Sequence, residues 1–218
     1  MRPLRLIGIM RLAPDAALPV VQWKAMDFSM DALTGLLVGL GLAAACGFRV
    51  FVPLLIMSIA SYTGYLDLRA GFDWMGTVPA LLAFATATIL EIGAYYIPWV
   101  DNILDTLAAP AAIVAGVVVT ASTLTEVDPF VAWTLAAIGG GSTAGVVQIT
   151  TTAIRHASTL TTGGLANPLV STVEAAGSFF LATLAVVVPV IAIGFVLALF
   201  IYAGRKILAW RRPASARP

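Results

Sequence analysis

Long apolar stretches decide what this chain can fold into. A helix needs about 20 residues to cross the hydrocarbon core of a bilayer, and five stretches reach that length: 32–62, 76–100, 104–124, 129–154 and 172–204. Only 11% of the residues are charged and 60% are hydrophobic, whereas a soluble domain carries about 25% charged residues. The sequence therefore predicts an all-α, polytopic transmembrane helix bundle with about five spans.

The first and last stretches are longer than one span requires, so broken or re-entrant helices are expected. The first contains Gly47, Arg49 and Pro53, and a proline cannot donate the backbone hydrogen bond of a regular helix. Either a discontinuous helix, as transporters use, or one tilted helix with a kink fits this pattern. The last stretch contains Pro189 near its middle, which fits one kinked helix or a re-entrant piece followed by a span.

The termini differ from the apolar body. We interpret residues 1–30 as an N-terminal extension, either disordered or added by a start codon placed too early; a short amphipathic anchor is the alternative. The transmembrane domain is expected over 31–204, with halves of about 31–103 and 104–204. Residues 205–218 form a basic tail with Arg205, Lys206, Arg211, Arg212 and Arg217. Basic residues favour the cytoplasmic side, so we expect a bacterial inner-membrane protein with a cytoplasmic C-terminus.

Two bases and two acids fall inside or at the rim of the apolar stretches: Arg49, Glu91, Arg155 and Glu174. A charge at the centre of a membrane helix costs roughly 2.5–3.5 kcal/mol on insertion scales. Such residues persist where they pair, line a wet cavity or do chemistry. Arg49 is the expected partner of Glu91, and this pair either fixes only the helix register or contains a carboxylate that responds to protons or cations.

A weak internal repeat accompanies these charges. A small-residue helix, an arginine and then a glutamate with small and aromatic neighbours recur in both halves, at Arg49 and Glu91 and at Arg155 and Glu174. An odd number of spans between the halves would make the repeat inverted in the membrane. Chance similarity between helices rich in glycine and alanine is the alternative.

The fourth stretch carries a small-then-polar helical face. Steps of three and four residues place on it Gly141, Ala144, Gly145, Gln148, Thr151, Thr152, Arg155, Ser158 and Thr159, and on the opposite face Ile138, Val146, Val147 and Ile149. Such a face either packs tightly against another helix or lines a hydrated path. The polar segment that follows, 156–174, predicts a re-entrant loop or an ordinary surface connection around Asn167.

Several classes of function are disfavoured. The glycine run 139–141 lacks the lysine of a phosphate loop, and the sequence has no G-x-S-x-G, H-E-x-x-H or C-x-x-C motif. The single cysteine, Cys46, and the single histidine, His156, predict neither a disulfide nor a metal site. With a net charge of +1 and no basic stripe, no nucleic-acid partner is expected. We expect no cofactor.

Three pieces of the sequence resemble a known family: GLGLAAACGFRVFVPLL, EIGAYYIPWVDNILDTLAAPAAIVAG and TTGGLANPLVSTVEAAGSFF. They are similar to a bacterial integral-membrane family known as domain of unknown function 4126, over roughly 32–189. The more specific elements are G-F-R-V-F-x-P at 47–53 and P-W-V-D-N-x-x-D at 98–105. In this family further charges typically follow the glutamate, whereas here Ala94, Tyr95 and Tyr96 stand there. The resemblance implies a membrane fold and no particular activity.

The sequence as a whole favours a transporter- or channel-like protein that binds or passes a small polar or ionic solute. The residues expected to bind or gate it are Arg49, Glu91, Gln148, Thr151, Thr152, Arg155, Asn167 and Glu174. The expected partners are the lipid bilayer, that solute and a second copy of the chain, which would pack through glycine and alanine faces. A non-catalytic scaffold with structural charges is the alternative, and a lipid-modifying enzyme using Asp101 and Asp105 is a third and weaker reading.

Overall fold

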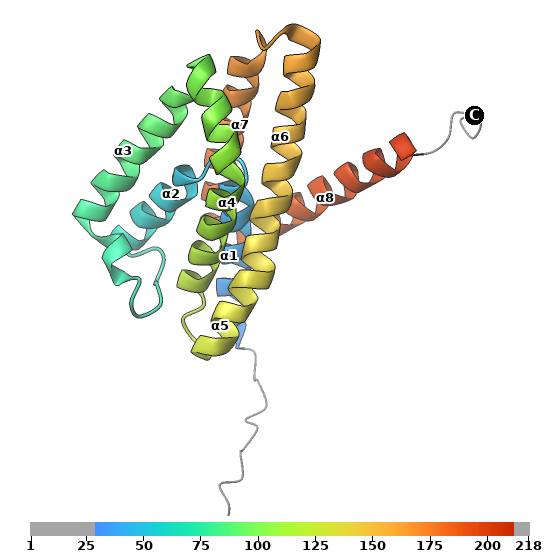
Figure 1. Cartoon of the computed structure of the whole chain (residues 1–218). Helices are drawn as coiled ribbons and strands as arrows, with labels where there is room; N and C mark the ends of the chain where they lie inside the picture. Colours follow the sequence, from blue (N-terminus) through green and yellow to red (C-terminus); the bar gives the residue numbers. More distant parts are fainter. Residues whose placement is uncertain (1–28, 212–218) are drawn as a thin grey trace, which may run out of the picture.

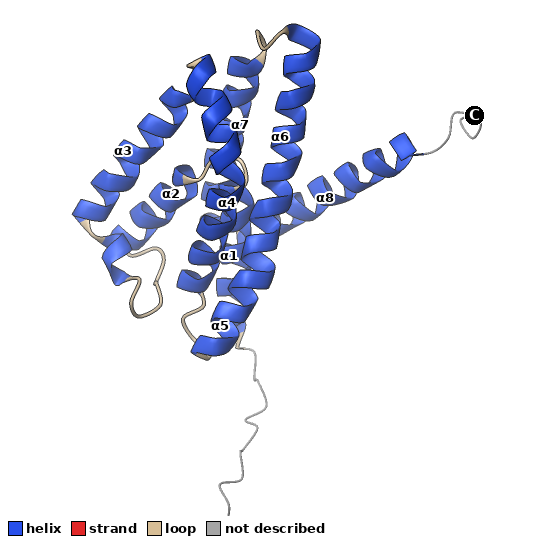
Figure 2. Ribbon diagram, viewed as in Figure 1, coloured by secondary structure: helices blue, strands red, loops and turns tan. Residues whose placement is uncertain are grey.

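The computed structural model describes residues 29–211, apart from the side chains at positions 98, 99, 101, 102, 105, 203 and 206–211. Within this part the regular structure is entirely helical (Figure 2), which confirms the all-α prediction. The helices are α1 (Met30–Cys46), α2 (Phe51–Tyr62), η1 (Asp73–Gly76), α3 (Val78–Ala94), α4 (Pro98–Thr123), α5 (Pro129–Leu135), η2 (Ala136–Gly141), α6 (Ser142–Thr162), α7 (Asn167–Val187) and α8 (Pro189–Arg211).

Local sequence signals account for several helix ends. The Ser29 hydroxyl accepts a hydrogen bond from the backbone N–H of Ala32 at 3.0 Å, and Asp128 Oδ1 accepts one from the backbone N–H of Phe130 at 2.9 Å. Helices α1 and α5 therefore each begin with a side-chain cap. Proline is the first residue of α4, α5 and α8, where its missing N–H is not needed. Gly163 ends α6 in the left-handed conformation with φ of 64°, which glycine adopts without strain.

Within residues 29–211, three helices are long and apolar enough to cross a membrane: Thr106–Thr123 within α4, the continuous helix Pro129–Thr162 and Asn167–Val187. The helix from 129 to 162 contains η2, a π-helix, between α5 and α6. Four shorter helices are also apolar: Met30–Cys46, Phe51–Tyr62, Val78–Ala94 and Pro189–Tyr202. Length and composition therefore indicate a membrane protein.

The breaks fall near the positions that the sequence indicated. The first apolar stretch is two helices, α1 and α2, separated by residues 47–50. It is therefore a discontinuous helix rather than one kinked helix. Pro53 does not itself cause the break, because it occupies the first turn of α2, where proline is tolerated. The last stretch is also two helices, which meet at Val188.

Several helices have other boundaries than the apolar stretches indicated. Helix α6 continues to Thr162, so residues 156–162 are helical rather than part of a re-entrant loop, and only a turn at 163–166 leads to α7. Helix α8 extends to Arg211, into the expected tail. The proposed division at 103/104 falls inside α4. Residues 1–28 and 212–218 lie outside the part of the chain that is described.

Helix α1 is at the centre of the bundle. It packs against α4, α6, α7 and α8, and its buried face consists largely of small residues, including Ala43, Ala44, Ala45 and Cys46. Helices α2 and α3 lie together on one side, while α8 extends away from the other helices (Figure 1). Small side chains let the helix backbones approach closely, which is the usual basis of packing between membrane helices.

The small-residue part of the α6 face is buried, and close approach to α4 explains its glycines. A Cβ atom added to Gly141 would lie 3.0 Å from Val117 Cγ2, and one added to Gly145 would lie 3.2 Å from Ile113 Cγ1. On the opposite face, Ile138 and Ile149 are exposed and suited to contact lipid. Val147 was expected there too, but it is buried against the break between α1 and α2.

Candidate functional site

The break between α1 and α2 leaves backbone groups that a continuous helix would have paired. The Ala45 carbonyl accepts hydrogen bonds from the backbone N–H groups of Phe48 and Arg49, at 3.0 and 3.1 Å, and from the Ser178 hydroxyl at 3.0 Å. At the start of α2, the Glu91 carboxylate accepts from the N–H groups of Val50 and Phe51, at 2.7 and 3.0 Å. Side chains of α3 and α7 therefore satisfy the broken backbone, as burial in a membrane requires.

Gly47 permits this break to pack against α6. A Cβ atom at this position would lie 2.5 Å from Val147 Cβ and 2.6 Å from the Ala144 carbonyl oxygen. The backbone of the break therefore lies directly on α6, and this contact fixes where the next side chain, Arg49, can reach.

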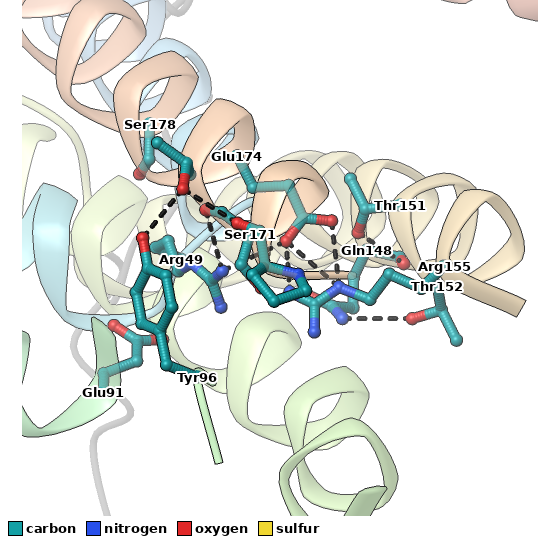
Figure 3. A network of polar contacts seen from close by, with 12 residues as sticks. Arg49, Glu91, Tyr96, Gln148, Thr151, Thr152, Arg155, Ser171, Glu174 and Ser178 are labelled. Atoms are coloured by element: carbon teal, nitrogen blue, oxygen red, sulfur yellow. Dashed lines mark hydrogen bonds and ion pairs between the residues drawn. The ribbon is translucent and has the colours of Figure 1, made fainter. Parts of the chain in front are cut away.

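Arg49, Arg155 and Glu174 meet beside the break. Arg49 Nη2 lies 3.2 Å from Glu174 Oε2 and donates to the Ser171 carbonyl at 3.1 Å. Arg155 Nε lies 3.1 Å from both Glu174 oxygens, and its Nη2 also pairs with this carboxylate. Figure 3 shows the two guanidinium groups approaching Glu174 from α6 and from the break. One carboxylate therefore joins cations from both halves of the chain.

Tyr95 completes this group at the end of α3. Its ring centroid lies 3.7 Å from Arg49 Cζ and 4.1 Å from Arg155 Cζ, distances typical of cation–π contacts. All four residues are buried, and Arg49 is only 1% exposed. We call Arg49, Tyr95, Arg155 and Glu174 the arginine cluster.

The expected pair of Arg49 with Glu91 was wrong. Arg49 forms its ion pair with Glu174, and Glu91 instead accepts from the N–H groups of Val50 and Phe51, where α2 begins. The physical reason is the break itself, because the start of a helix presents unpaired N–H groups and the positive end of its dipole to a nearby carboxylate. Glu91 is therefore a capping residue supplied by another helix.

The other expected site residues extend from the arginine cluster along α6 and α7. Thr151 donates to the Gln148 carbonyl at 3.0 Å, and Gln148 Nε2 donates to the Thr152 hydroxyl at 3.2 Å. Asn167 Nδ2 donates to the Thr159 hydroxyl at 3.0 Å. Gln148 and Thr151 are buried, whereas Asn167 is half-buried near the 163–166 turn.

The depth of the cluster follows from helix geometry. Arg155 precedes the end of α6 at Thr162 by seven residues, and Glu174 follows the start of α7 at Asn167 by seven. At about 1.5 Å per residue, the cluster lies about 10 Å from the 163–166 turn. Thr159 of α6 and Asn167 of α7 lie in this interval and are hydrogen-bonded to each other.

The hydrogen-bonding capacity of the cluster is incomplete. Nε and Nη1 of Arg49 and the hydroxyl of Ser171 are buried without a hydrogen-bond partner among the described residues. A buried polar group without a partner costs about 1–3 kcal/mol, and more when it is charged. These atoms are therefore the places where a bound molecule would be stabilised.

A groove lies between α2, α3 and α4, and Tyr95 of the arginine cluster lines part of it. Its volume is about 430 Å³, and its lining is apolar except for Glu91 and Tyr95, with Phe51, Leu90, Leu104 and Leu107 among the other residues. In the described part of the chain, no three histidine, cysteine or acidic side chains gather to hold a metal ion. The side chains of Asp101 and Asp105, the expected residues of an enzyme, lie outside the described part.

A comparison with known families decides the relationship of the chain. The family described as "Domain of unknown function (DUF4126)" matches residues 36–208. The chain belongs to the DUF4126 family. No curated protein matches it, and no solved structure does either.

The match confirms the resemblance seen in the DUF4126 motifs, and the structure explains one of them. In G-F-R-V-F-x-P at 47–53, Gly47 allows contact with α6, Arg49 enters the cluster, and Pro53 lies in the first turn of α2. The motif therefore encodes a helix break and the cation placed beside it.

Sequence reasoning missed three residues of the site in this DUF4126 chain. Tyr95 was noted only as a neighbour of Glu91, yet its ring contacts both guanidinium groups. Ser171 supplies a carbonyl to Arg49, and Ser178 binds the end of α1. The available signal was their spacing, because Tyr95 follows Glu91 by one helical turn, and Ser171 and Ser178 flank Glu174 by about one turn on each side.

Proposed function

We propose that this protein binds a small polar or ionic solute at the arginine cluster and passes it across the membrane. The observation that carries the proposal is Arg49, which is 1% exposed and keeps Nε and Nη1 without a partner among the described residues. A buried cation with unused donors is costly unless a ligand supplies the missing acceptors.

The surroundings of Arg49 support the same proposal. The cluster joins side chains from both halves of the chain beside a helix break, an arrangement that transporters use to build solute sites. The polar residues between the cluster and the 163–166 turn offer a hydrated approach from one side. We propose Gln148, Thr151, Thr152 and Asn167 as residues of this approach, with Glu91 supporting the break.

Flux through reconstituted vesicles tests the proposal. The purified chain is reconstituted, and uptake of small anions, cations and neutral polar solutes is compared for the wild type and Arg49→Lys. Arg205→Lys is the matched control, because Arg205 is exposed on α8. We expect at least one solute whose uptake falls about tenfold in Arg49→Lys and not in Arg205→Lys. No Arg49-dependent uptake or binding by a folded protein would refute the proposal.

A second candidate is a membrane scaffold whose charges only hold helices together. The binding of Glu91 to the start of α2 favours it, because this role is complete without a ligand. A scaffold predicts that the triple variant Arg49→Met, Arg155→Met, Glu174→Leu is about as stable as the wild type, since well-packed apolar residues can replace buried ion pairs. If this variant is stable but lacks uptake, a solute site is favoured instead.

We also propose a bacterial inner-membrane location, a cytoplasmic C-terminus and a homo-oligomer. The support is the basic C-terminal sequence and the positive-inside rule, together with glycine and alanine faces that favour helix association. A fluorescent reporter fused to the C-terminus is expected to mature in the cytoplasm, and cross-linking in the membrane is expected to give a discrete multiple of the chain. A periplasmic reporter signal would contradict the orientation.

A further inference from the structure

The unused groups around the arginine cluster share one chemical property. Arg49 Nε and Nη1 can only donate hydrogen bonds, and the buried hydroxyls of Ser171 and Ser158, also without partners among the described residues, can donate as well. The acidic groups nearby are already engaged. Glu174 accepts from both arginines, and each oxygen of Glu91 accepts a backbone N–H. The unused atoms of Arg49 therefore require an acceptor, and the two serine hydroxyls, which can donate or accept, are able to bind the same acceptor.

Spare donors on a buried cation select the charge of a ligand. A cation brought to Arg49 would meet a like charge at low dielectric, whereas an anion would gain charge-assisted hydrogen bonds. The position also limits the size of the ligand, because Arg49 is 1% exposed and enclosed by the break, α7 and the Tyr95 ring.

We propose that the ligand is a small oxyanion or carboxylate, bound by the Arg49 guanidinium and the Ser171 hydroxyl. This inference rests on the proposed function and names its substrate class. The anion enters from the 163–166 turn, past Asn167 and Thr159, along the polar side of α6 and α7. It occupies donors that Glu174 leaves unused, so the Glu174 carboxylate remains between the two arginines.

Binding to the full chain in a neutral maltoside detergent tests the inference. Nitrate, formate and inorganic phosphate are titrated as sodium salts, with bulky gluconate as the reference anion at constant ionic strength. Potassium and ammonium gluconate form the cation series. Isothermal titration gives the dissociation constant, and the thermal unfolding midpoint gives an independent measure. We expect at least one small anion to bind and stabilise the protein, and the cations to do neither.

Two variants assign the binding to the proposed donors. Arg49→Lys keeps the charge but removes the spare guanidinium N–H groups, and loss of a hydrogen bond to a charged group weakens binding about 10- to 100-fold. Ser171→Ala is a milder change that tests the site even if Arg49→Lys does not fold, and we expect severalfold weaker binding. Arg205→Lys controls for arginine replacement at an exposed position and is expected to bind as the wild type does.

The outcomes separate this inference from the proposed function. Arg49-dependent binding of cations without anions would overturn the anion assignment and leave the solute site standing. Anion binding that is unchanged in both Arg49→Lys and Ser171→Ala would overturn the assigned donors. Absence of any Arg49-dependent binding or uptake would overturn both proposals. If free anions have no effect but added phosphatidic acid stabilises the wild type and not Arg49→Lys, the oxyanion is a lipid headgroup phosphate.

Discussion

Replacement of Glu174 by glutamine removes the negative charge that lies between two buried guanidinium groups. The side chain keeps its size, so the change isolates charge from packing. Glu174 contacts Nε and Nη2 of Arg155 and lies 3.2 Å from Nη2 of Arg49. An amide oxygen can accept from one arginine, but its NH₂ group then faces another donor. At least one buried cation therefore loses its counter-charge.

The expected cost follows from the burial of the three residues. Arg49, Arg155 and Glu174 are at most 5% exposed. Removal of one partner from a buried ion pair costs about 3–5 kcal/mol, because an uncompensated charge remains, whereas an exposed pair contributes about 0–1 kcal/mol. We therefore expect Glu174→Gln to lower the free energy of unfolding by about 3–5 kcal/mol.

Equilibrium unfolding in mixed micelles measures this difference. Increasing fractions of dodecyl sulfate unfold the protein, and loss of helix is followed by circular dichroism. Glu126→Gln is the matched control, since Glu126 is exposed, and we expect its unfolding free energy to stay within about 0.5 kcal/mol of the wild type. A loss below about 1 kcal/mol for Glu174→Gln would refute the reasoning, because it would mean that water compensates both guanidinium groups.

The same titration tests three other features. Glu91→Leu leaves the N–H groups of Val50 and Phe51 unpaired at the start of α2, so we expect a loss of about 2–4 kcal/mol in the free energy of unfolding; an unchanged free energy would show that water binds these groups instead. Gly47→Ala places a methyl group against α6 and should cost about 1–3 kcal/mol, whereas Gly177→Ala, in open space, should be neutral or stabilise by up to about 1 kcal/mol. Equal effects at the two glycines would contradict the close packing. Tyr95→Leu removes the aromatic face from both guanidinium groups and should cost about 2 kcal/mol more than Tyr95→Phe, which keeps it; no difference would exclude the cation–π contribution.

The sequence could predict which charged residues belong to the site, because a charge in an apolar stretch is energetically costly. Arg49, Arg155 and Glu174 were singled out because isolated charges in apolar stretches are expensive, and the structure brings these three residues together. Which acid pairs with which base was not predictable in the same way. It depends on the start of α2, whose free N–H groups bind Glu91. The sequence indicated a break near Gly47, but not which side chain of another helix would lie beside it.

The fold shows the same division between what sequence predicts and what it does not. Apolar length predicted a helical membrane protein, and the positions of Gly47 and Pro189 indicated where long stretches break. The extent of α6 was underestimated because residues 156–162 are polar. The threonine hydroxyls among them bond to carbonyls of the preceding turn, as Thr159 does to Arg155 at 3.0 Å, so polarity there does not end the helix.

The π-helix η2 has a consequence for the angle at which α6 presents its side chains. A π turn holds one more residue than an α turn, and an α-helix rotates about 100° per residue. If the same residues wound as a regular α-helix, all that follows would be rotated by about 100°, and Arg155 would turn away from α7. Deletion of one residue from the glycine run 139–141 would instead remove the extra residue and leave Arg155 facing in about the same direction. The extra residue thus sets the orientation of α6, so that one uninterrupted helix places glycine against α4 and, further along, Arg155 against Glu174.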